Sequence, residues 1–229
     1  RQFSIVTRPI PEMPQGGRTL HVVPGNGGGT GSEKDPFRGI PAADAAARPG
    51  DIIRVRAGEY GEVEFSQSGA PDRHVVWTAA GDGPAVFSSA RLAGSHIWLD
   101  GLTFKRAAKS SGINCRQMPI EGIVLTRNHI SGYHYCITMT GQSKDWYVAD
   151  NVIVGSKLWP RQADPTRSEQ ENHPIAGEGV EMSSSRGGHV VCYNTISRVA
   201  DGISYPGRDS DIYGNDIFEV TDDAVETDR

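Results

Sequence analysis

The sequence has 229 residues, of which 37% are hydrophobic and 22% charged, and its formal net charge is −5. The negative charge argues against a nucleic-acid partner. No apolar run approaches the length of about 18 residues that a membrane span needs. The three cysteines, Cys115, Cys136 and Cys192, match no metal-binding spacing, so we expect buried free thiols.

The N-terminal part of the chain divides into an arm, a strand and a helix. Residues 1–18 are rich in proline and polar side chains and show no period, which is typical of an arm. Thr19–Val23 is the first predicted strand. A helix is predicted at about residues 37–48, because alanines favour helix, Pro41 suits the first turn and Pro49-Gly50 ends it.

Short strands follow the predicted helix. Val63–Phe65, Val75–Trp77 and Ala85–Phe87 are expected to be strands in a less regular region. From His96 onward the pattern becomes regular. The early part of the chain therefore predicts the same architecture as the later part, with weaker periodicity.

The regular part is a repeat built on an Asn-x-aliphatic unit followed by a second short strand. Asn128 and Asn151 are 23 residues apart, and Asn194 and Asn215 are 21 apart. A period in the low twenties with β-branched strands and no helical pattern predicts an all-β solenoid. Asparagine suits sharp bends, so these residues are expected to stack as a ladder of amide hydrogen bonds.

The repeat, together with Asp35-Pro36-Phe37 and the segment from Pro49 to Tyr60, resembles the right-handed parallel β-helix proteins of the pectate-lyase-like group. The resemblance covers about Leu20 to Arg229. It implies an all-β, right-handed parallel β-helix over residues 19–229 with a short N-terminal capping helix. It further implies that Ala57-Gly58-Glu59-Tyr60 is a turn after a core strand. It also implies a secreted or periplasmic protein whose partner is a polysaccharide.

One spacing is nearly double the others. Asn151 and Asn194 are 43 residues apart, and the segment between them is rich in proline and polar residues without alternation. We expect a loop insertion at about residues 156–175 rather than a hidden coil. Because the sequence stops inside a coil, we expect further coils or another chain to cover the C-terminal end.

Alignment of the repeats on their central aliphatic residues brings acidic residues into register. The aligned aliphatic residues are Ile113, Ile137, Val180, Ile203 and Val225. Two positions earlier stand Ser111, Tyr135, Glu178, Asp201 and Asp223, and one position later stand Asn114, Thr138, Glu181, Ser204 and Glu226. Equivalent positions in neighbouring coils lie about 4.8 Å apart, so the acids are predicted to form a column.

The acidic column has a functional and a structural interpretation. Stacked carboxylates repel unless a cation or a basic group joins them, which suggests a Ca²⁺ site or general acid and base groups. The alternative is a set of solvated turn acids, since Asp-Gly is a common turn pair. A lyase that acts on uronic acids must neutralise the carboxylate, remove the C5 proton and protonate the leaving oxygen.

Basic residues that could take part stand nearby in sequence, including Lys157 on the insertion. The candidate catalytic residues are Arg186, His173, Glu178 and Asp201. The candidate substrate-binding residues are Arg161, Arg167, Tyr135 and Arg208. The candidate ligands of a Ca²⁺ ion are Glu181, Asp223 and Glu226.

No catalytic motif of a single β-helix family is matched. Ser183-Ser184-Ser185-Arg186 stands where chondroitinase-B-like and alginate-lyase-like proteins carry a lysine, and the calcium motifs of pectate lyases are absent. The acidic column and the nearby basic residues nevertheless favour a lyase that cleaves a uronate-containing polysaccharide by β-elimination. A glycoside hydrolase with a carboxylate pair and a non-catalytic carbohydrate-binding or surface-structural protein remain alternatives.

Overall fold

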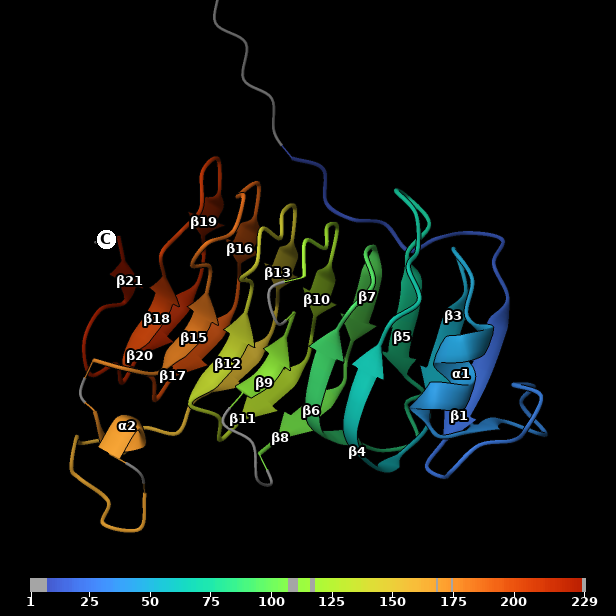
Figure 1. Ribbon diagram of the computed structural model, residues 1–229, viewed down its shortest axis with the longest axis horizontal. Coiled ribbons are helices and arrows are strands. Elements are labelled where there is room, and N and C mark those ends of the chain that lie inside the picture. Colours follow the sequence, from blue (N-terminus) through green and yellow to red (C-terminus); the bar gives the residue numbers. More distant parts are fainter. Residues whose placement is uncertain (1–7, 107–110, 116–117, 168, 174, 228–229) are drawn as a thin grey trace, which may run out of the picture.

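The computed structural model describes residues 8–106, 111–115, 118–167, 169–173 and 175–227. Its strands pair in parallel and wind into a β-solenoid of about seven turns (Figure 1). A short helix stands at the N-terminal end. The predicted fold class, an all-β parallel β-helix with an N-terminal capping helix, is confirmed. No helix among the described residues is long and apolar enough to cross a membrane.

Two parallel sheets form the walls of the solenoid. Sheet A has nine strands. In spatial order they are β19 (Asp211–Tyr213), β16 (Val190–Cys192), β13 (Tyr147–Ala149), β10 (Val124–Thr126), β7 (Ile97–Asp100), β5 (Val75–Ala79), β3 (Ile52–Val55), β1 (Thr19–Val23) and β2 (Phe37–Arg38).

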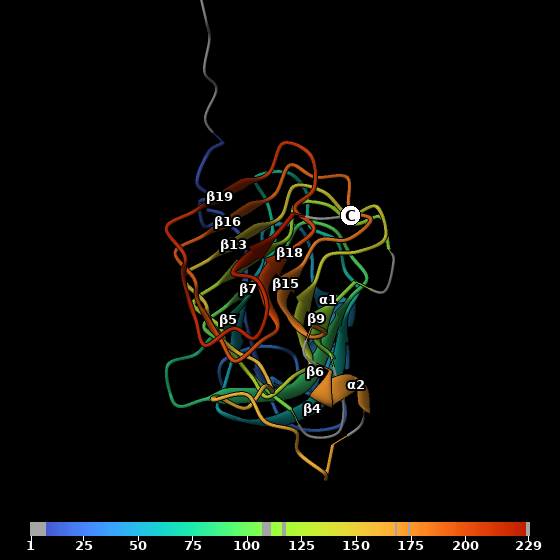
Figure 2. The same cartoon turned by 90° about the vertical axis from the view of Figure 1, so that its left-hand side faces the viewer.

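Sheet B has twelve strands and divides at β6 into two branches. The first branch holds β8 (Thr103–Lys105), β11 (His129–Ser131), β14 (Val152–Val154), β17 (Thr195–Ser197) and β20 (Asp216–Phe218). The second branch holds β9 (Ser111–Asn114), β12 (Tyr135–Thr138), β15 (Glu178–Glu181), β18 (Asp201–Ser204) and β21 (Val225–Glu226). Figure 2 shows the coil outline nearly end-on.

The division of sheet B explains the irregular early repeats. Strands β4 (Gly58–Phe65) and β6 (Ala85–Leu92) each run for eight residues without a break. In β6, Phe87 pairs with β8 while Ala90 pairs with β9, so one strand spans both branches. The turn predicted at Ala57-Gly58-Glu59-Tyr60 was wrong from Gly58 onward, because those residues begin β4.

The helix α1 (Ile40–Ala46) closes the N-terminal end of the core. It contacts β1, β2 and β4 and buries Ile40 and Ala43. Gly39 precedes it with a φ of 88°, a backbone conformation that favours glycine. Asp44 of this helix is also buried, and its Oδ2 atom accepts a hydrogen bond from the Ser66 hydroxyl at 2.6 Å. The helix therefore both covers apolar side chains and fixes the end of β4.

The interior is one continuous apolar core, as expected of stacked coils. Aromatic rings stack along it, with 5.0 Å between the ring centroids of Tyr60 and Phe87 and 5.3 Å between those of Phe87 and Phe104. Offset stacking of this kind adds to the stabilisation from burial. Cys115, Cys136 and Cys192 are free and buried, which confirms the prediction for the thiols.

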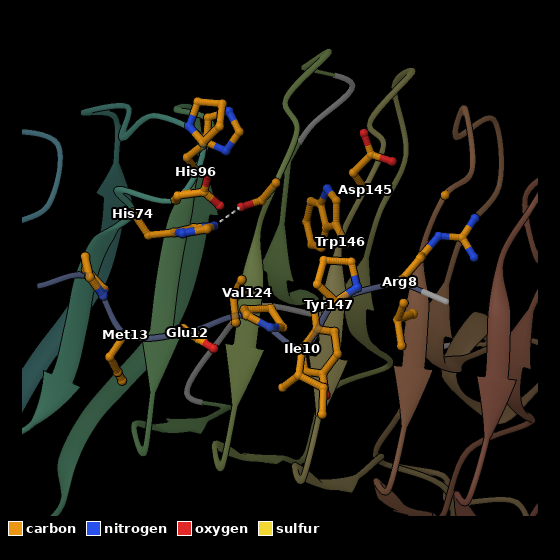
Figure 3. A pocket seen from close by; sticks show the side chains of 18 of the residues that line it. Arg8, Ile10, Glu12, Met13, His74, His96, Val124, Asp145, Trp146 and Tyr147 are labelled. Atoms are coloured by element: carbon orange, nitrogen blue, oxygen red, sulfur yellow. Dashed lines mark hydrogen bonds between the residues drawn. The ribbon is translucent and has the colours of Figure 1, made fainter. Parts of the chain in front are cut away.

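The arm crosses the outer face of sheet A (Figure 3). Met13 packs against an apolar strip formed by Val76, Trp98 and Val124. Arg8 forms an ion pair with Asp211 at 2.5 Å, far along the solenoid in β19. Between the arm and the sheet lies a cavity of about 740 Å³. The arm therefore spans several coils on the face opposite to the branches of sheet B.

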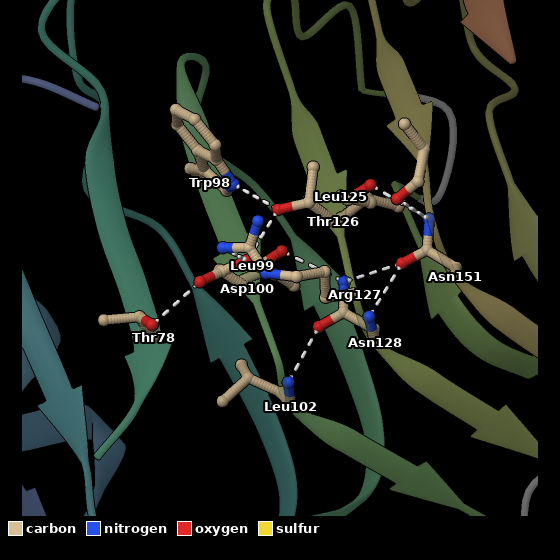
Figure 4. A network of polar contacts seen from close by, with 11 residues as sticks. Thr78, Trp98, Leu99, Asp100, Leu102, Leu125, Thr126, Arg127, Asn128 and Asn151 are labelled. Atoms are coloured by element: carbon tan, nitrogen blue, oxygen red, sulfur yellow. Dashed lines mark hydrogen bonds and ion pairs between the residues drawn. The ribbon is translucent and has the colours of Figure 1, made fainter. Parts of the chain in front are cut away.

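Asparagines at the bend between sheet A and sheet B form the predicted ladder (Figure 4). The Oδ1 atom of Asn151 accepts hydrogen bonds from the backbone and side-chain nitrogens of Asn128, at 3.0 and 3.1 Å. Asn194 and Asn215 continue the pattern. Asn128, Asn151 and Asn194 are about 1% exposed. The ladder satisfies polar groups that would otherwise be buried without partners.

A second polar network lies next to the ladder on sheet A. The carboxylate of Asp100 accepts hydrogen bonds from the hydroxyls of Thr78 and Thr126, at 2.9 and 2.7 Å, and pairs with Arg127 at 2.6 Å (Figure 4). The Trp98 indole donates to Thr126 at 2.7 Å. Asp100 is 4% exposed, and its charge is matched by Arg127, so we assign this network to the fold.

Residues 155–177 connect β14 to β15 and include a single helical turn, α2 (Glu169–Asn172). The described residues of this connection contain no strand. β15 pairs directly with β12 of the coil before it and with β18 of the coil after it. The described residues of the connection thus add no strand between β14 and β15, and we call residues 155–177 the insertion.

Candidate functional site

Acidic residues on β15, β18 and β21 form a column on the second branch of sheet B. Glu178 pairs in register with Asp201, and Glu181 pairs with Ser204, which pairs with Glu226. The predicted register of these repeats is confirmed by the strand pairing. Glu178 and Asp201 are only 7% and 2% exposed. We call these four acids the acid column.

Three aspartates converge at the end of this column. One carboxylate oxygen each from Asp201, Asp222 and Asp223 lies within 4.8 Å of the other two. The Oδ1 atom of Asp201 also accepts a hydrogen bond from the Asp223 backbone nitrogen at 3.0 Å, which ties the connection before β21 to β18. Burial, with smaller contributions from the charges of Glu226, Asp222 and Asp223, raises the pKa of Asp201 to about 6, although the hydrogen bond from the Asp223 backbone acts in the opposite direction. We call these residues the aspartate triad.

The chemistry of the triad fits a hard divalent cation. Carboxylate oxygens are the ligands that Ca²⁺ prefers, and a bound cation would relieve the repulsion that raises the pKa of Asp201. Asp223 was predicted as a metal ligand and Asp201 as a catalytic acid, and the structure brings both together with Asp222. Asp222 was missed because it has no equivalent in the other repeats.

Glu178 has the most perturbed carboxyl of the acid column. Burial raises the pKa of Glu178 to about 8, and the negative charges of Glu181, Asp201 and Glu226 act in the same direction. Its Oε2 atom is buried and has no hydrogen-bond partner among the described residues. A carboxyl in this environment holds a proton at neutral pH, as a general acid must.

Lys157 brings the insertion to the acid column. The side chain is 8% exposed, and its Nζ atom donates a hydrogen bond to the backbone oxygen of His173 at 2.6 Å. Burial lowers the pKa of Lys157, whereas the charges of Glu178 and Asp201 raise it. The sequence placed Lys157 on the insertion but gave it no role, because burial of a lysine within a polar segment leaves no pattern.

The predicted binding residues of the insertion have different environments. The guanidinium of Arg167 pairs with Asp164 at 3.1 Å and donates to the backbone oxygen of Ser156. Arg161 is exposed and lines a small cavity together with Lys157 and Thr221. His173 is exposed, and its Nδ1 atom lies 3.4 Å from the backbone nitrogen of Ile175.

Arg186 and Arg208 are exposed and lie on the turns that lead from sheet B back to sheet A. The backbone nitrogen of Arg186 donates to Ser143, and its charge helps lower the pKa of Glu121, next to the arm cavity. The backbone oxygen of Arg208 accepts a hydrogen bond from Gly188. These backbone hydrogen bonds fix the positions of both residues within their turns.

Tyr135 lies on β12, one coil before Glu178. Its ring packs edge-on against His134, with 4.6 Å between the centroids. It pairs in register with Ser111 of β9, as the repeat alignment predicted. Tyr135 therefore extends the row of aligned positions toward the N-terminal end of the second branch of sheet B.

The cavity under the arm is a separate feature that the sequence did not indicate. His74 and Tyr147 line it from sheet A, and Ile10 and Met13 line it from the arm (Figure 3). The Nε2 atom of His74 lies 2.9 Å from the backbone oxygen of Gly122, and burial lowers the pKa of His74. The cavity lies against sheet A, whereas the acid column lies on sheet B.

Comparison with known proteins supports the architecture. No family model matches the chain, and no curated protein matches it in sequence. Among solved structures, the chain is similar to pectate lyase Pel9A, with a TM-score of 0.65 and 19% identity over 82% of this chain and 50% of that chain. A rhamnogalacturonan lyase also matches, with a TM-score of 0.42 and 12% identity over 88% of this chain and 63% of that chain.

The chain thus spans about half the length of the pectate lyase structure that it matches. At 19% identity the likeness concerns the fold, and the chemistry has to be argued from the residues of the site. The parallel β-solenoid of this chain agrees with that likeness. The chain has the fold of the pectate-lyase-like parallel β-helix proteins.

Proposed function

We propose that this chain belongs to a secreted or periplasmic polysaccharide lyase that cleaves a uronate-containing polysaccharide by β-elimination. The observation that carries the proposal is the aspartate triad beside Glu178, a buried carboxyl whose pKa is raised to about 8. The fold, which resembles that of a pectate lyase, adds support because it offers an extended side surface for a linear glycan.

Asp201, Asp222 and Asp223 would hold a Ca²⁺ ion, with the charges of Glu181 and Glu226 close by. When bound, the ion would neutralise a uronate carboxylate and so make the C5 proton more acidic. The hydrogen bond from the Asp223 backbone nitrogen to Asp201 would hold these carboxylates in place for the ion. The predicted ligand Asp223 belongs to the triad, and Glu181 and Glu226 contribute charge in this proposal.

Glu178 is the proposed proton donor to the leaving oxygen, because its carboxyl is protonated at neutral pH. Lys157 places a positive charge beside Glu178 and Asp201 and holds the backbone of His173. Arg186 and His173 stay candidate catalytic residues, and in this proposal one of them would accept the C5 proton. The predicted contacts to the glycan stay Arg161, Arg167, Tyr135 and Arg208. Among these residues, Arg167 already forms an ion pair with Asp164.

The experiment is a screen of uronate polysaccharides with added Ca²⁺ and, in parallel, with a chelator. The proposal expects an unsaturated uronide, detected by its ultraviolet absorbance, on at least one substrate in the presence of Ca²⁺ alone. Substrate degradation without this absorbance would reject β-elimination. Binding of a polysaccharide without any degradation would reject catalysis by this chain.

The second candidate is a glycoside hydrolase, and one observation favours it. Glu178 and Asp201 stand in register on neighbouring strands, and the pKa of Glu178 is raised to about 8 and that of Asp201 to about 6. Two carboxyls that ionise in different pH ranges can serve as acid and base in glycoside hydrolysis. Release of reducing sugar without the unsaturated product, in chelator, would select this reaction.

A further inference from the structure

Trp159 on the insertion is exposed in a way that the fold does not explain. The chain has four tryptophans. Trp77, Trp98 and Trp146 are at most 5% exposed, whereas Trp159 is 48% exposed. Tryptophan gains more from burial than most side chains, and an exposed one is a frequent anchor in binding surfaces. The position of Trp159 therefore points to a ligand.

Arg161 stands two residues further along the same segment. Lys157 binds the backbone of His173, and Arg167 binds Asp164 and Ser156. The Arg161 side chain is exposed and has no ion pair or hydrogen bond within the described residues. Of these three cations of the insertion, Arg161 is the one whose charge is free to meet an anionic ligand.

The insertion holds Trp159 and Arg161 next to the aspartate triad. The backbone nitrogen of Lys157 donates to the backbone oxygen of Arg198 at 2.9 Å, which fixes the start of the insertion to the following coil. Arg161 and Thr221 line the same small cavity. Thr221 directly precedes Asp222 of the triad. The segment is therefore adjacent to the proposed cation site and anchored to the solenoid.

The negatively charged aspartate triad and the positively charged Arg161 lie on the same part of the surface. The triad would bind a uronate carboxylate only through a cation, whereas Arg161 can pair with a carboxylate directly and in a bidentate way. An aromatic ring beside an arginine suits a sugar ring that carries a carboxylate, because the ring offers an apolar face and the guanidinium a fixed pair of donors. Both features are found together in the insertion.

We propose that Trp159 and Arg161 form a subsite for a second uronate unit, one that lies beside the unit bound at the aspartate triad. Trp159 packs against the face of the sugar, and Arg161 pairs with its carboxylate. This inference rests on the proposed function, and it narrows the substrate to glycans with uronate units at two positions along the bound segment. A glycan with isolated uronate units would lose one of the two contacts.

The test uses the fluorescence of Trp159, since the other three tryptophans are buried. Uronate oligosaccharides of increasing length are added to the whole chain with Ca²⁺, and quenching of tryptophan emission by acrylamide is measured. We expect oligosaccharides long enough to span both positions to protect the emission from quenching, and a single uronate to leave it unchanged. The protection should be lost in chelator.

Two variants test the energetic contributions. Arg161→Ala is expected to weaken oligosaccharide binding by roughly 10- to 100-fold, and Trp159→Ala by about 10-fold. The matched controls are Arg54→Ala and Tyr193→Ala, which remove an exposed arginine and an exposed tyrosine from sheet A and the bend that follows it. Both controls should bind as the unmodified chain does.

The outcomes separate this inference from the proposed function. If the unmodified chain binds uronate oligosaccharides with Ca²⁺ but Trp159 stays open to acrylamide and both variants bind normally, the subsite is rejected while the cation site stands. If no uronate glycan binds at all, the proposed function fails and the subsite fails with it. Protection of Trp159 together with weakened binding in both variants supports the subsite.

Discussion

The Oδ1 atom of Asn194 accepts two hydrogen bonds from Asn151, one from the backbone nitrogen at 3.0 Å and one from the side chain at 2.9 Å. The side-chain nitrogen of Asn194 in turn donates to the backbone oxygens of Val148 and Cys192. One side chain therefore joins successive coils and satisfies several backbone groups that are removed from water.

We expect Asn194→Ala to destabilise the protein by about 3 kcal/mol, because it leaves buried donors and acceptors without partners. Asn215→Ala is the matched control. Asn215 donates to Val191, but it lies in the terminal coil and is less buried, so its loss should cost clearly less. Chemical denaturation of both variants gives the comparison. Equal destabilisation would mean that burial does not set the strength of the ladder.

The aspartate triad predicts a measurable cation affinity. Asp222→Asn keeps the shape of an exposed side chain and removes one charge, so Ca²⁺ binding should weaken by at least about 10-fold, with little change in the melting temperature in chelator. Glu59→Gln removes the charge of an exposed residue of β4, far from the triad, and serves as control. Calorimetric titration with Ca²⁺ measures both. Unchanged affinity in Asp222→Asn and Asp223→Asn would show that the triad is not a cation site and that its members are solvated turn acids.

Glu178 predicts a pH dependence of activity with a definite sign. Its pKa is raised to about 8, so the protonated form that can act as an acid disappears as the pH rises through that value. On any uronate substrate that the chain cleaves, activity should fall on the alkaline side. Glu178→Gln should lower the rate by about 100-fold and remove this limb. A variant that keeps both the rate and the pH profile would exclude Glu178 as the proton donor.

Glu178 also links stability to pH in the chelated protein. The folded pKa lies above the usual value of 4.5, so the folded state binds this proton more tightly than the unfolded state does. The resulting stabilisation is complete below about 4.5 and is lost as the pH rises toward about 8. Glu178→Gln should flatten this slope in denaturation measured between those pH values.

His189 predicts the opposite slope at acidic pH. The imidazole is fully buried, and its Nδ1 atom accepts a hydrogen bond from the Trp146 backbone nitrogen at 3.2 Å. Burial, with a smaller contribution from the charge of Arg8, lowers the pKa of His189 from 6.5 to about 4. The unfolded chain therefore takes up the proton first, and the contribution of His189 to stability falls by about 2 kcal/mol between about pH 7.5 and pH 5.

Denaturation at the two pH values, in the unmodified chain and in His189→Gln, measures this contribution. The variant should lose the part of the slope that His189 supplies. His129→Gln changes an exposed histidine of β11 and should leave the slope as it is. An unaltered slope in His189→Gln would show that other groups cause the acid sensitivity.

Short-range patterns in the sequence determined the repeating part of the fold. The Asn-x-aliphatic unit predicted the ladder, and alignment on residues such as Ile203 predicted which acids share a register. These features could be predicted because each coil repeats the same local conformation, and side chains at equivalent positions must stack at the spacing of neighbouring strands. The capping helix was predicted from alanine, proline and glycine at its ends.

Only the tertiary structure decided the partners that no period relates. Asp222 joins Asp201 because the connection before β21 folds back onto β18, and Lys157 reaches the acid column because the insertion is tied to the next coil. The continuity of β4 and β6, and the path of the arm to Asp211, are likewise set by contacts distant in sequence. A repeat fixes the spacing of the coils along the solenoid. The burial and the charge environment of residues outside the repeat depend instead on how the non-repeating segments pack against the coils.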